Sequence, residues 1–260
     1  MVFKRLLEAM GVGGPSVETE LTDPNCRPGG TLAGLVRVAG GGEDPIDVEY
    51  VSIGLITRVT ITEGATRYAA DQEFHRQRLT GSFRLDPGAR HEIGFEFAVP
   101  WETPITEVYG QHLHGMTMGL STELEVARAV EKSDLHEVAV HPLPAQERIL
   151  DALLRLGFRF IRADVEHGRL HGARQRLPFR QDIAFGPPAA YASAIEELAV
   201  TFLPAPERMQ VVFEADPRVP RGRAAFGHFE VDPITVDGVD WMAQVDAWLR
   251  QAAARRGMVL

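Results

Sequence analysis

The stretch Ser16-Val-Glu-Thr-Glu-Leu21 sets the fold class, because Val17, Thr19 and Leu21 alternate in it with two glutamates. A period of two residues is typical of a strand with one buried and one exposed face. The same period continues through Ile46–Ile61, a long run rich in the β-branched residues that favour strands. Further strands are predicted over Thr31–Val38, Glu73–Leu79, Glu92–Val99, Met116–Val126 and Leu135–Val140.

Short segments rich in glycine and proline separate these predicted strands, as turns do. They are Asp23-Pro24, Arg27-Pro-Gly-Gly30, Gly40-Gly-Gly42 and Asp86-Pro-Gly88. A parallel sheet would need crossover helices between the strands, and the sequence offers no helical period there. Residues 1–141 are therefore predicted to form an antiparallel β-sandwich.

The segment His141-Pro-Leu-Pro144 interrupts this pattern. A helical period follows, with Pro144 at a position where helices commonly begin and Gly157 where they commonly end, so residues 142–157 are predicted to be a linker helix. Residues 158–235 return to strands and are predicted to form a second sandwich. Its strands are expected at Phe158–Val165, Leu177–Phe185, Ile195–Leu203, Gln210–Ala215 and Ala225–Val231.

Both ends of the chain carry apolar stripes at helical spacing. Residues 236–260 are predicted to contain a C-terminal amphipathic helix, packed on its own domain through Trp241, Val245, Trp248, Leu249 and Ala252. Residues 2–10 are predicted to form a short N-terminal helix with the stripe Phe3, Leu6, Leu7 and Met10. That stripe either docks on the first domain or serves as a detachable anchor for a partner or a membrane surface. The fold class is thus all-β, with two tandem sandwiches and three helices.

Charge and cysteine content restrict the classes of function. Residues 1–140 hold 12 basic and 21 acidic side chains, which argues against binding to nucleic-acid phosphates. Cys26 is the one cysteine, so neither an intramolecular disulfide nor an all-cysteine metal site can form. Glu8 interrupts the apolar run that a signal peptide would need, and no stretch approaches the ~18–20 apolar residues that span a bilayer. We expect a cytoplasmic protein.

Several motifs together resemble one bacterial family. They are residues 3–13 (FKRLLEAMGVG), 27–41 (RPGGTLAGLVRVAGG), 85–106 (LDPGARHEIGFEFAVPWETPIT) and 136–160 (HEVAVHPLPAQERILDALLRLGFRF). In their order along nearly the whole chain, they resemble the sporulation-control proteins, stage-zero sporulation protein M and its relatives. The resemblance implies an arrestin-like pair of sandwiches without a catalytic centre. It also implies a role in the onset of sporulation or in related stress and cell-division programmes.

Two groups of side chains are candidates for chemistry or binding. His112 and His114 would lie on one face of a strand and, with Glu107, could bind a transition metal, although the neighbouring glycines favour an irregular loop with exposed histidines. Arg174 and Arg176 belong to a basic segment that we interpret either as a flexible solvated loop or as a site for an anion or an acidic partner. We find no phosphate-binding loop, nucleophile elbow or zinc-protease helix motif.

The leading hypothesis is a non-catalytic protein-interaction scaffold without a cofactor, which binds other proteins through Phe3, Leu6, Leu7, Met10, Arg174 and Arg176. The sequence does not identify the partner, and self-association stays open. One alternative is a metal-dependent enzyme that uses His112 and His114. The other is a peripheral membrane adaptor that uses the N-terminal helix, for which the negative net charge of −9 is unfavourable. Neither nucleic acid nor membrane is an expected partner.

Overall fold

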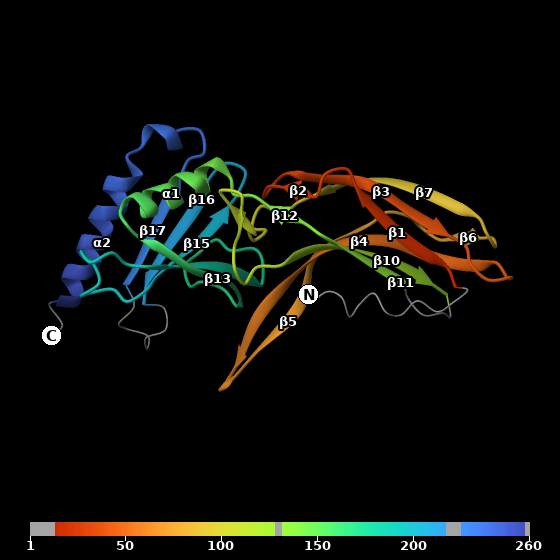
Figure 1. Ribbon diagram of the computed structural model, residues 1–260, viewed down its shortest axis with the longest axis horizontal. Coiled ribbons are helices and arrows are strands. Elements are labelled where there is room, and N and C mark those ends of the chain that lie inside the picture. The colour runs from red at the N-terminus through yellow and green to blue at the C-terminus, as the bar shows by residue number, and fades with distance from the viewer. Residues whose placement is uncertain (1–13, 128–131, 217–224, 258–260) are drawn as a thin grey trace.

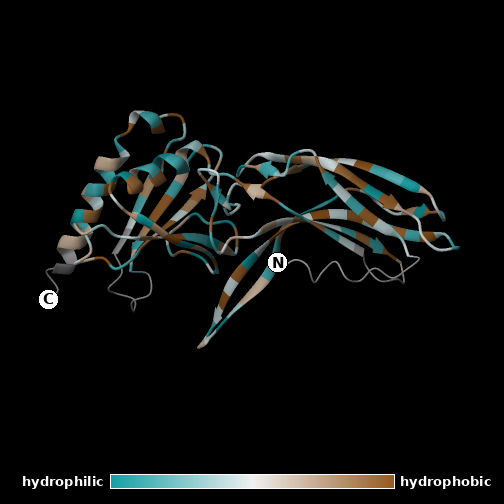
Figure 2. Ribbon diagram, in the orientation of Figure 1, coloured by the Kyte–Doolittle hydropathy of each residue, from teal (hydrophilic) through white to brown (hydrophobic). Residues whose placement is uncertain are grey.

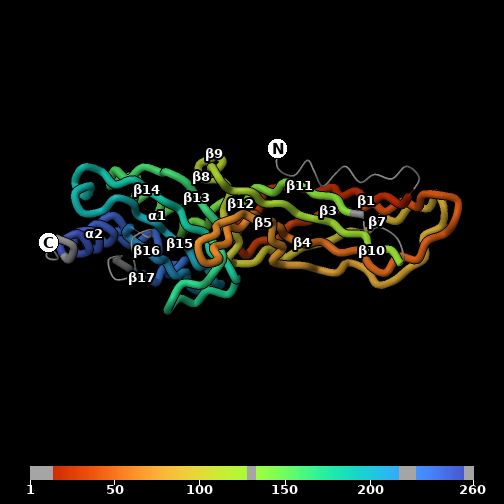
Figure 3. Tube along the Cα trace, turned by 90° about the horizontal axis from the view of Figure 1, so that it is seen from below, coloured from red at the N-terminus to blue at the C-terminus, as the bar shows by residue number. Residues whose placement is uncertain are grey.

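The computed structural model describes residues 14–127, 132–216 and 225–257. The molecule is elongated, with two lobes that follow one another along its long axis (Figures 1 and 3). In the first lobe, the sheet β1 (Ser16–Leu21), β3 (Thr31–Ala39) and β7 (Arg90–Ala98) packs on strands β4 (Ile46–Glu63), β10 (Met118–Val126) and β11 (Lys132–Glu137). The short strands β2 (Asn25–Cys26), β6 (Phe83–Leu85), β8 (Glu107–Val108), β9 (Gln111–His112) and β12 (Ala139–Val140) complete it.

Alternation of side chains produces the core of this first lobe. On β7, Phe95 and Phe97 are buried while Glu96 between them is exposed, and Figure 2 shows the same alternation along neighbouring strands. At one edge of the sandwich, the hydroxyls of Thr19 and Thr122 lie 2.6 Å apart across the two sheets. Asp134 of β11 accepts a hydrogen bond from the Thr19 N–H at 2.8 Å. The predicted antiparallel sandwich is thus closed at this edge by polar contacts.

Strand β4 connects the two lobes. Its far end forms a long hairpin with β5 (Thr66–Arg78), which projects from the body between the lobes (Figure 1). Thr60 of β4 also pairs in parallel with Glu166 of β13 (Arg159–His167), the first strand of the second lobe. Strands of both lobes therefore belong to one ten-stranded sheet in the described part of the chain.

The second lobe contains an antiparallel sheet whose strands follow chain order: β13, β14 (Phe179–Gly186), β15 (Leu198–Pro204), β16 (Met209–Ala215) and β17 (Ala225–Val231). One face of this sheet packs against α2 (Trp241–Gly257), where Trp248 stacks on Phe213 with ring centroids 5.5 Å apart. The stripe predicted for this helix is confirmed, since Trp241, Val245, Leu249 and Ala252 are buried. In the described residues, helices occupy the position that a facing second sheet would take.

Helix α1 (Pro144–Arg155) lies within the predicted range 142–157 and packs against α2. Pro144 stands in its first turn, and the Leu143 N–H donates to the side chain of Gln146 at 2.7 Å. Gly157, at φ 93°, ends the helix in a conformation that other residues rarely adopt. A short 3-10 helix, Val236–Gly238, precedes α2. The predicted helix 2–10 lies outside the described residues, and the division into domains stays a prediction.

Candidate interaction site

The segment between β13 and β14, residues 168–178, carries two of the predicted contact residues, and we call it the arginine loop. Its centre is Gln175, whose side chain is only 6% exposed. The amide oxygen of Gln175 accepts from the Leu170 N–H at 3.0 Å, and its nitrogen lies within 3.0 Å of the carbonyls of Gly168, Leu177 and Phe179. One buried side chain therefore holds the backbone of the whole loop.

The first lobe fixes the same loop from outside. Both carboxylate oxygens of Glu102 accept from the Arg176 N–H, at 2.8 and 2.9 Å, and one also accepts from the Leu177 N–H at 2.9 Å. The Arg174 N–H donates to the side chain of Gln210 at 3.1 Å. These bonds do not fit the flexible segment expected from sequence. The side chains of Arg174 and Arg176 remain exposed on either side of the buried Gln175.

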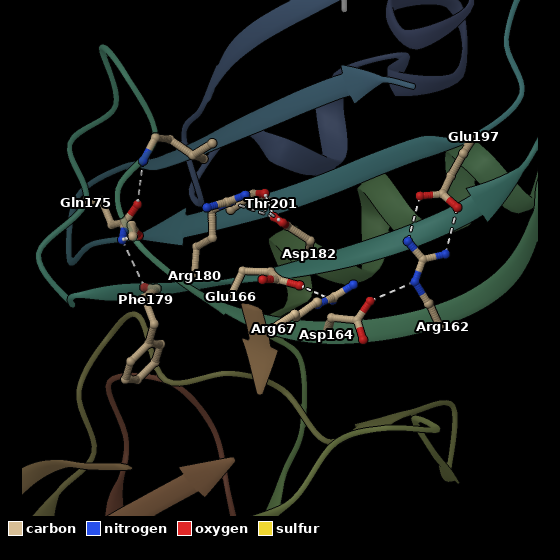
Figure 4. Close-up of polar contacts among 12 residues, drawn as sticks. Arg67, Arg162, Asp164, Glu166, Gln175, Phe179, Arg180, Asp182, Glu197 and Thr201 are labelled. Carbon is tan, nitrogen blue, oxygen red and sulfur yellow. Dashed lines mark hydrogen bonds and ion pairs between the residues drawn. The ribbon is translucent and has the colours of Figure 1, made fainter. Parts of the chain in front are cut away.

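Beside this loop, charged side chains cover the face of the second-lobe sheet that points away from α2, which we call the polar face (Figure 4). Arg162 of β13 donates two hydrogen bonds to Glu197, at 2.6 and 2.7 Å, and one to Asp164 at 2.7 Å. On β14, Arg180 pairs with Asp182 at 3.0 Å. From the tip of the projecting hairpin, Arg67 reaches Glu166 at 2.5 Å.

Burial changes the acidity of the carboxylates on the polar face. It raises the pKa of Asp182, against the opposing effects of Arg180 and of the Thr201 hydroxyl, which donates to Asp182 at 2.6 Å. It also raises the pKa of Glu166, where Arg67 opposes the rise. For Glu214 of β16, burial raises the pKa and the nearby charge of Asp182 adds to the effect. Asp182 and Glu166 are thus compensated by arginines, whereas Glu214 forms no ion pair within the described residues.

Sequence reasoning missed this network, although a signal for it was present. Arg162, Asp164 and Glu166 stand two residues apart, and so do Arg180 and Asp182, which places each set on one face of its strand. Charged residues at strand period predict a polar face. Which of these residues lie opposite one another on β13 and β14, however, depends on a register that the sequence does not reveal.

The two histidines considered as metal ligands, His112 and His114, differ in their surroundings. His112 lies opposite Glu107 in the β8–β9 pair, but its ring nitrogen lies 2.9 Å from the Met116 carbonyl. The Glu107 carboxylate lies 3.7 Å from the ring of His141, and His114 is exposed. Within the residues that the structure describes, no three histidine, cysteine, aspartate or glutamate side chains are grouped so as to hold a metal ion.

The other predicted contact residues, Phe3, Leu6, Leu7 and Met10, lie outside the described residues. In the described part of the chain, no helix is both long enough and apolar enough to cross a membrane. Arg174 and Arg176 are thus the predicted contact residues whose surroundings the structure defines.

Comparison with known proteins shows which family these features come from. The model of the family described as "SpoOM protein" (Spo0M) matches residues 3–219. The chain belongs to the Spo0M family. The sporulation-control protein Spo0M of Bacillus subtilis is 32% identical over 217 residues, which cover 83% of this chain and 81% of that protein. The crystal structure of Spo0M from the same organism matches with a TM-score of 0.82 and 27% identity, over 93% of this chain and 100% of that one.

These findings confirm the resemblance that the sequence motifs indicated, and with it the β-rich, arrestin-like fold of the Spo0M family. The likeness extends through both lobes, since it covers nearly the whole chain. The overall architecture that carries the arginine loop and the polar face is therefore similar to that of a protein named for sporulation control.

Proposed function

We propose that this protein controls sporulation, or a related stress or cell-division programme, by binding other proteins in the cytoplasm without catalysing a reaction. The observation that carries the proposal is the match to Spo0M over almost the full length of both chains. The name of the Bacillus relative supplies the regulatory role. The relative is named a control protein, and a control protein can act by binding other proteins, which supports the proposed mode of action.

The arginine loop is the surface that we assign to a partner. Arg174 and Arg176 are exposed, while Gln175 and Glu102 fix the backbone that carries them. A backbone that is ordered before binding reduces the entropy lost on association. Guanidinium groups bind carboxylates through paired hydrogen bonds, so the fitting partner presents an acidic segment.

The test is a crosslinking pull-down from the native cells, followed by mass spectrometry. The baits are the wild-type protein, the double variant Arg174→Glu/Arg176→Glu, and the control Arg84→Glu/Arg90→Glu. The control reverses two exposed arginines at β6 and β7, in the first lobe. We expect one set of proteins with the wild type and the control, and its loss with the loop variant. Equal recovery by all three baits would exclude the arginine loop as the contact.

A bait that lacks residues 1–12 extends the same experiment to Phe3, Leu6, Leu7 and Met10. If the N-terminal stripe contributes to binding, this bait recovers less partner while its folding, followed by circular dichroism, is unchanged. Recovery of the full set would assign the contact to the rest of the chain. If even the wild-type bait recovers no specific protein, the interaction role itself is wrong.

A further inference from the structure

The far half of strand β5 has a free edge. Residues 66–69 and Asp71 are exposed, and β5 pairs on one side with β4. Within the described residues, no strand pairs with its other side, and no backbone group there bonds to another segment. The hairpin projects from the body, so this edge faces solvent (Figure 1). An unpaired strand edge is a template for another strand.

The turn of the hairpin determines which residues point outward. Glu63 pairs with Thr66 across the two-residue turn Gly64-Ala65, and Gly64 has the positive φ of 61° that a type II′ turn requires. The residues that flank such a turn form a hydrogen-bonded pair, and bonded and non-bonded pairs then alternate along the strands. The backbone groups of Arg67, Ala69 and Asp71 therefore point away from β4.

This edge lacks several of the features that usually prevent pairing, and its two charged residues, Arg67 and Asp71, are of opposite sign. Residues 66–71 (Thr-Arg-Tyr-Ala-Ala-Asp) contain no proline or lysine. The irregularity between β4 and β5 lies further along, at Leu55/Ile56, so the far half of the hairpin is regular. Ala69 and Ala70 have the smallest side chains after glycine. They therefore permit the backbone of another strand to approach closely.

We propose that two copies of this chain pair antiparallel through this edge, about a two-fold axis at Ala69. In this register the outward-pointing residues pair with one another, as strand hydrogen bonding requires. Ala69 then faces its counterpart on the axis, and Arg67 of each copy lies opposite Asp71 of the other. A shift by two residues in either direction keeps the hydrogen bonds but loses the Arg67–Asp71 pairs. One of these shifts places Arg67 opposite Glu73, whose carboxylate is already bound by Arg76 at 2.6 and 2.9 Å.

The same pairing suits both faces of the hairpin. Arg67, Ala69 and Asp71 share one face, where Arg67 pairs with Glu166 and Asp71 lies 3.9 Å from Arg58. These contacts hold the side chains of Arg67 and Asp71 on one face of the hairpin. In the proposed dimer, Asp71 and Arg67 of the second copy lie on the same face. On the other face, Tyr68, 42% exposed, comes to lie beside Ala70 of the second copy. The sequence of the edge is therefore complementary to itself.

The contact is short, so the dimer is weak. Six residues on each side bury much less than the ~1,200–2,000 Å² of a stable interface. We expect a dissociation constant on the order of 10–100 μM, with exchange between monomer and dimer in solution. This inference is independent of the partner assigned to the arginine loop.

Charge reversal provides a test with its own control. Arg67→Glu places glutamate opposite Asp71, and Asp71→Arg places arginine opposite Arg67, twice in each dimer because of the symmetry. Sedimentation velocity over a concentration series should show that each variant alone dimerises about tenfold or more weakly than the wild type. A mixture of the two variants restores opposite charges at both positions. It should associate as the wild type does.

The mixture also distinguishes loss of pairing from loss of structure. If Arg67→Glu merely disorders the hairpin through its contact with Glu166, mixing will not restore association. Wild-type protein that remains monomeric up to ~500 μM would overturn the proposal, since a dissociation constant of 10–100 μM gives mostly dimer there. So would unchanged association of both variants.

A second measurement locates the axis. Ala69→Cys brings two cysteines together at Cα separations of about 5.5 Å, within the range of a disulfide. The native Cys26 is buried and does not compete. Mild oxidation should yield a covalent dimer for Ala69→Cys and much less for the adjacent Ala70→Cys. Equal yields from both variants would place the contact elsewhere.

Discussion

At the scale of single residues, the carboxylates of the polar face differ in how their charges are compensated. Asp182 has Arg180 at 3.0 Å and a hydroxyl donor, and Glu166 has Arg67 at 2.5 Å. Glu214 is half-buried with no ion-pair partner in the described part of the chain. Burial and the charge of Asp182 raise its pKa, and the charge of Arg180 opposes the rise. A partly buried carboxylate without such a partner costs stability whenever it is ionised.

Glu214→Gln should therefore stabilise the protein at neutral pH. The pKa of Glu214 is raised in the folded protein, so the folded state loses stability as pH rises from the ordinary glutamate value of ~4.3 through the raised value. Below that window the group is protonated in both states and the variant gains nothing. Thermal unfolding from pH 3.5 to 8 should show a higher melting temperature for the variant near pH 7 and convergence in acid. A constant difference across the range would contradict the electrostatic cause.

Gln175 allows a prediction for the arginine loop. Gln175→Ala removes the acceptor for the Leu170 N–H and the donor to three carbonyls, and leaves these buried groups without their partner. We expect a loss of about 2 kcal/mol in the free energy of unfolding, measured by urea titration. Gln244→Ala, on an exposed position of α2, is the control and should change little. Amide exchange should also rise in residues 168–178, and unchanged protection there would show that other contacts order the loop.

At the scale of elements, the docking of α2 depends on a missing side chain. A Cβ placed on Gly227 of β17 would lie 2.4 Å from the ring of Trp248. This closeness lets the Trp248 ring lie flat over Phe213 and edge-on to Phe229. The close approach of the helix to β17 thus depends on one glycine and one tryptophan.

Gly227→Ala should destabilise the protein by about 1–3 kcal/mol, because the extra methyl group overpacks this contact. Gly94→Ala on β7 is the matched control, since a Cβ there meets nothing within 4 Å. The control should be neutral or slightly stabilising. Chemical denaturation gives both values, and near-ultraviolet circular dichroism reports the Trp248 environment. Equal effects of the two substitutions would show that β17 and α2 separate easily.

Elements with strong local signals could be predicted from the sequence, and those made by long-range pairing could not. Pro144 and Gly157 marked α1 closely. In contrast, β5 was expected over Glu73–Leu79 but begins at Thr66. Its first half contains Ala69, Ala70 and Asp71, which are poor strand formers, and is extended because it pairs with β4 along its whole length. Pairing overrode local propensity.

The same limit applied to the candidate site. The exposed positions of Arg174 and Arg176 could be predicted from their charge, and the order of their loop could not. That order comes from Glu102, more than 70 residues away, and from one buried amide. A glutamine in a polar segment carries no sign that it will be buried, since the same residue is usually exposed.

At the scale of the whole molecule, strand pairing and side-chain contacts join the two lobes. Beyond the pairing of β4 with β13, the Gln181 side chain forms two hydrogen bonds to the backbone of Ile105, at 2.7 and 3.0 Å. Phe74 of β5 meets Phe179 of β14 edge-on, with ring centroids 5.3 Å apart. Neither lobe can unfold without exposing part of the other.

We therefore expect one calorimetric unfolding transition, although chains with two lobes often show two. Gln181→Ala should lower the temperature of that transition without dividing it, by about 2–4 °C for each kcal/mol lost. Hydrogen exchange near the midpoint should show β3 and β16 losing protection together. Two separated endotherms in the wild-type protein would show that the lobes unfold independently.

The pairing of β4 with β13 also affects how the chain folds as it leaves the ribosome. The first lobe can close once β12 has emerged and paired with β2, since Val140 lies beside Cys26. Thr60 of β4 cannot pair with Glu166 until β13 has been synthesised. Until then, the far end of β4 is paired with β5 on one side and has no strand on the other. Two hairpins on neighbouring nascent chains would meet in this interval with open edges on both sides. The projecting hairpin is consequently open to edge-to-edge pairing along both of its strands until the second lobe has been synthesised.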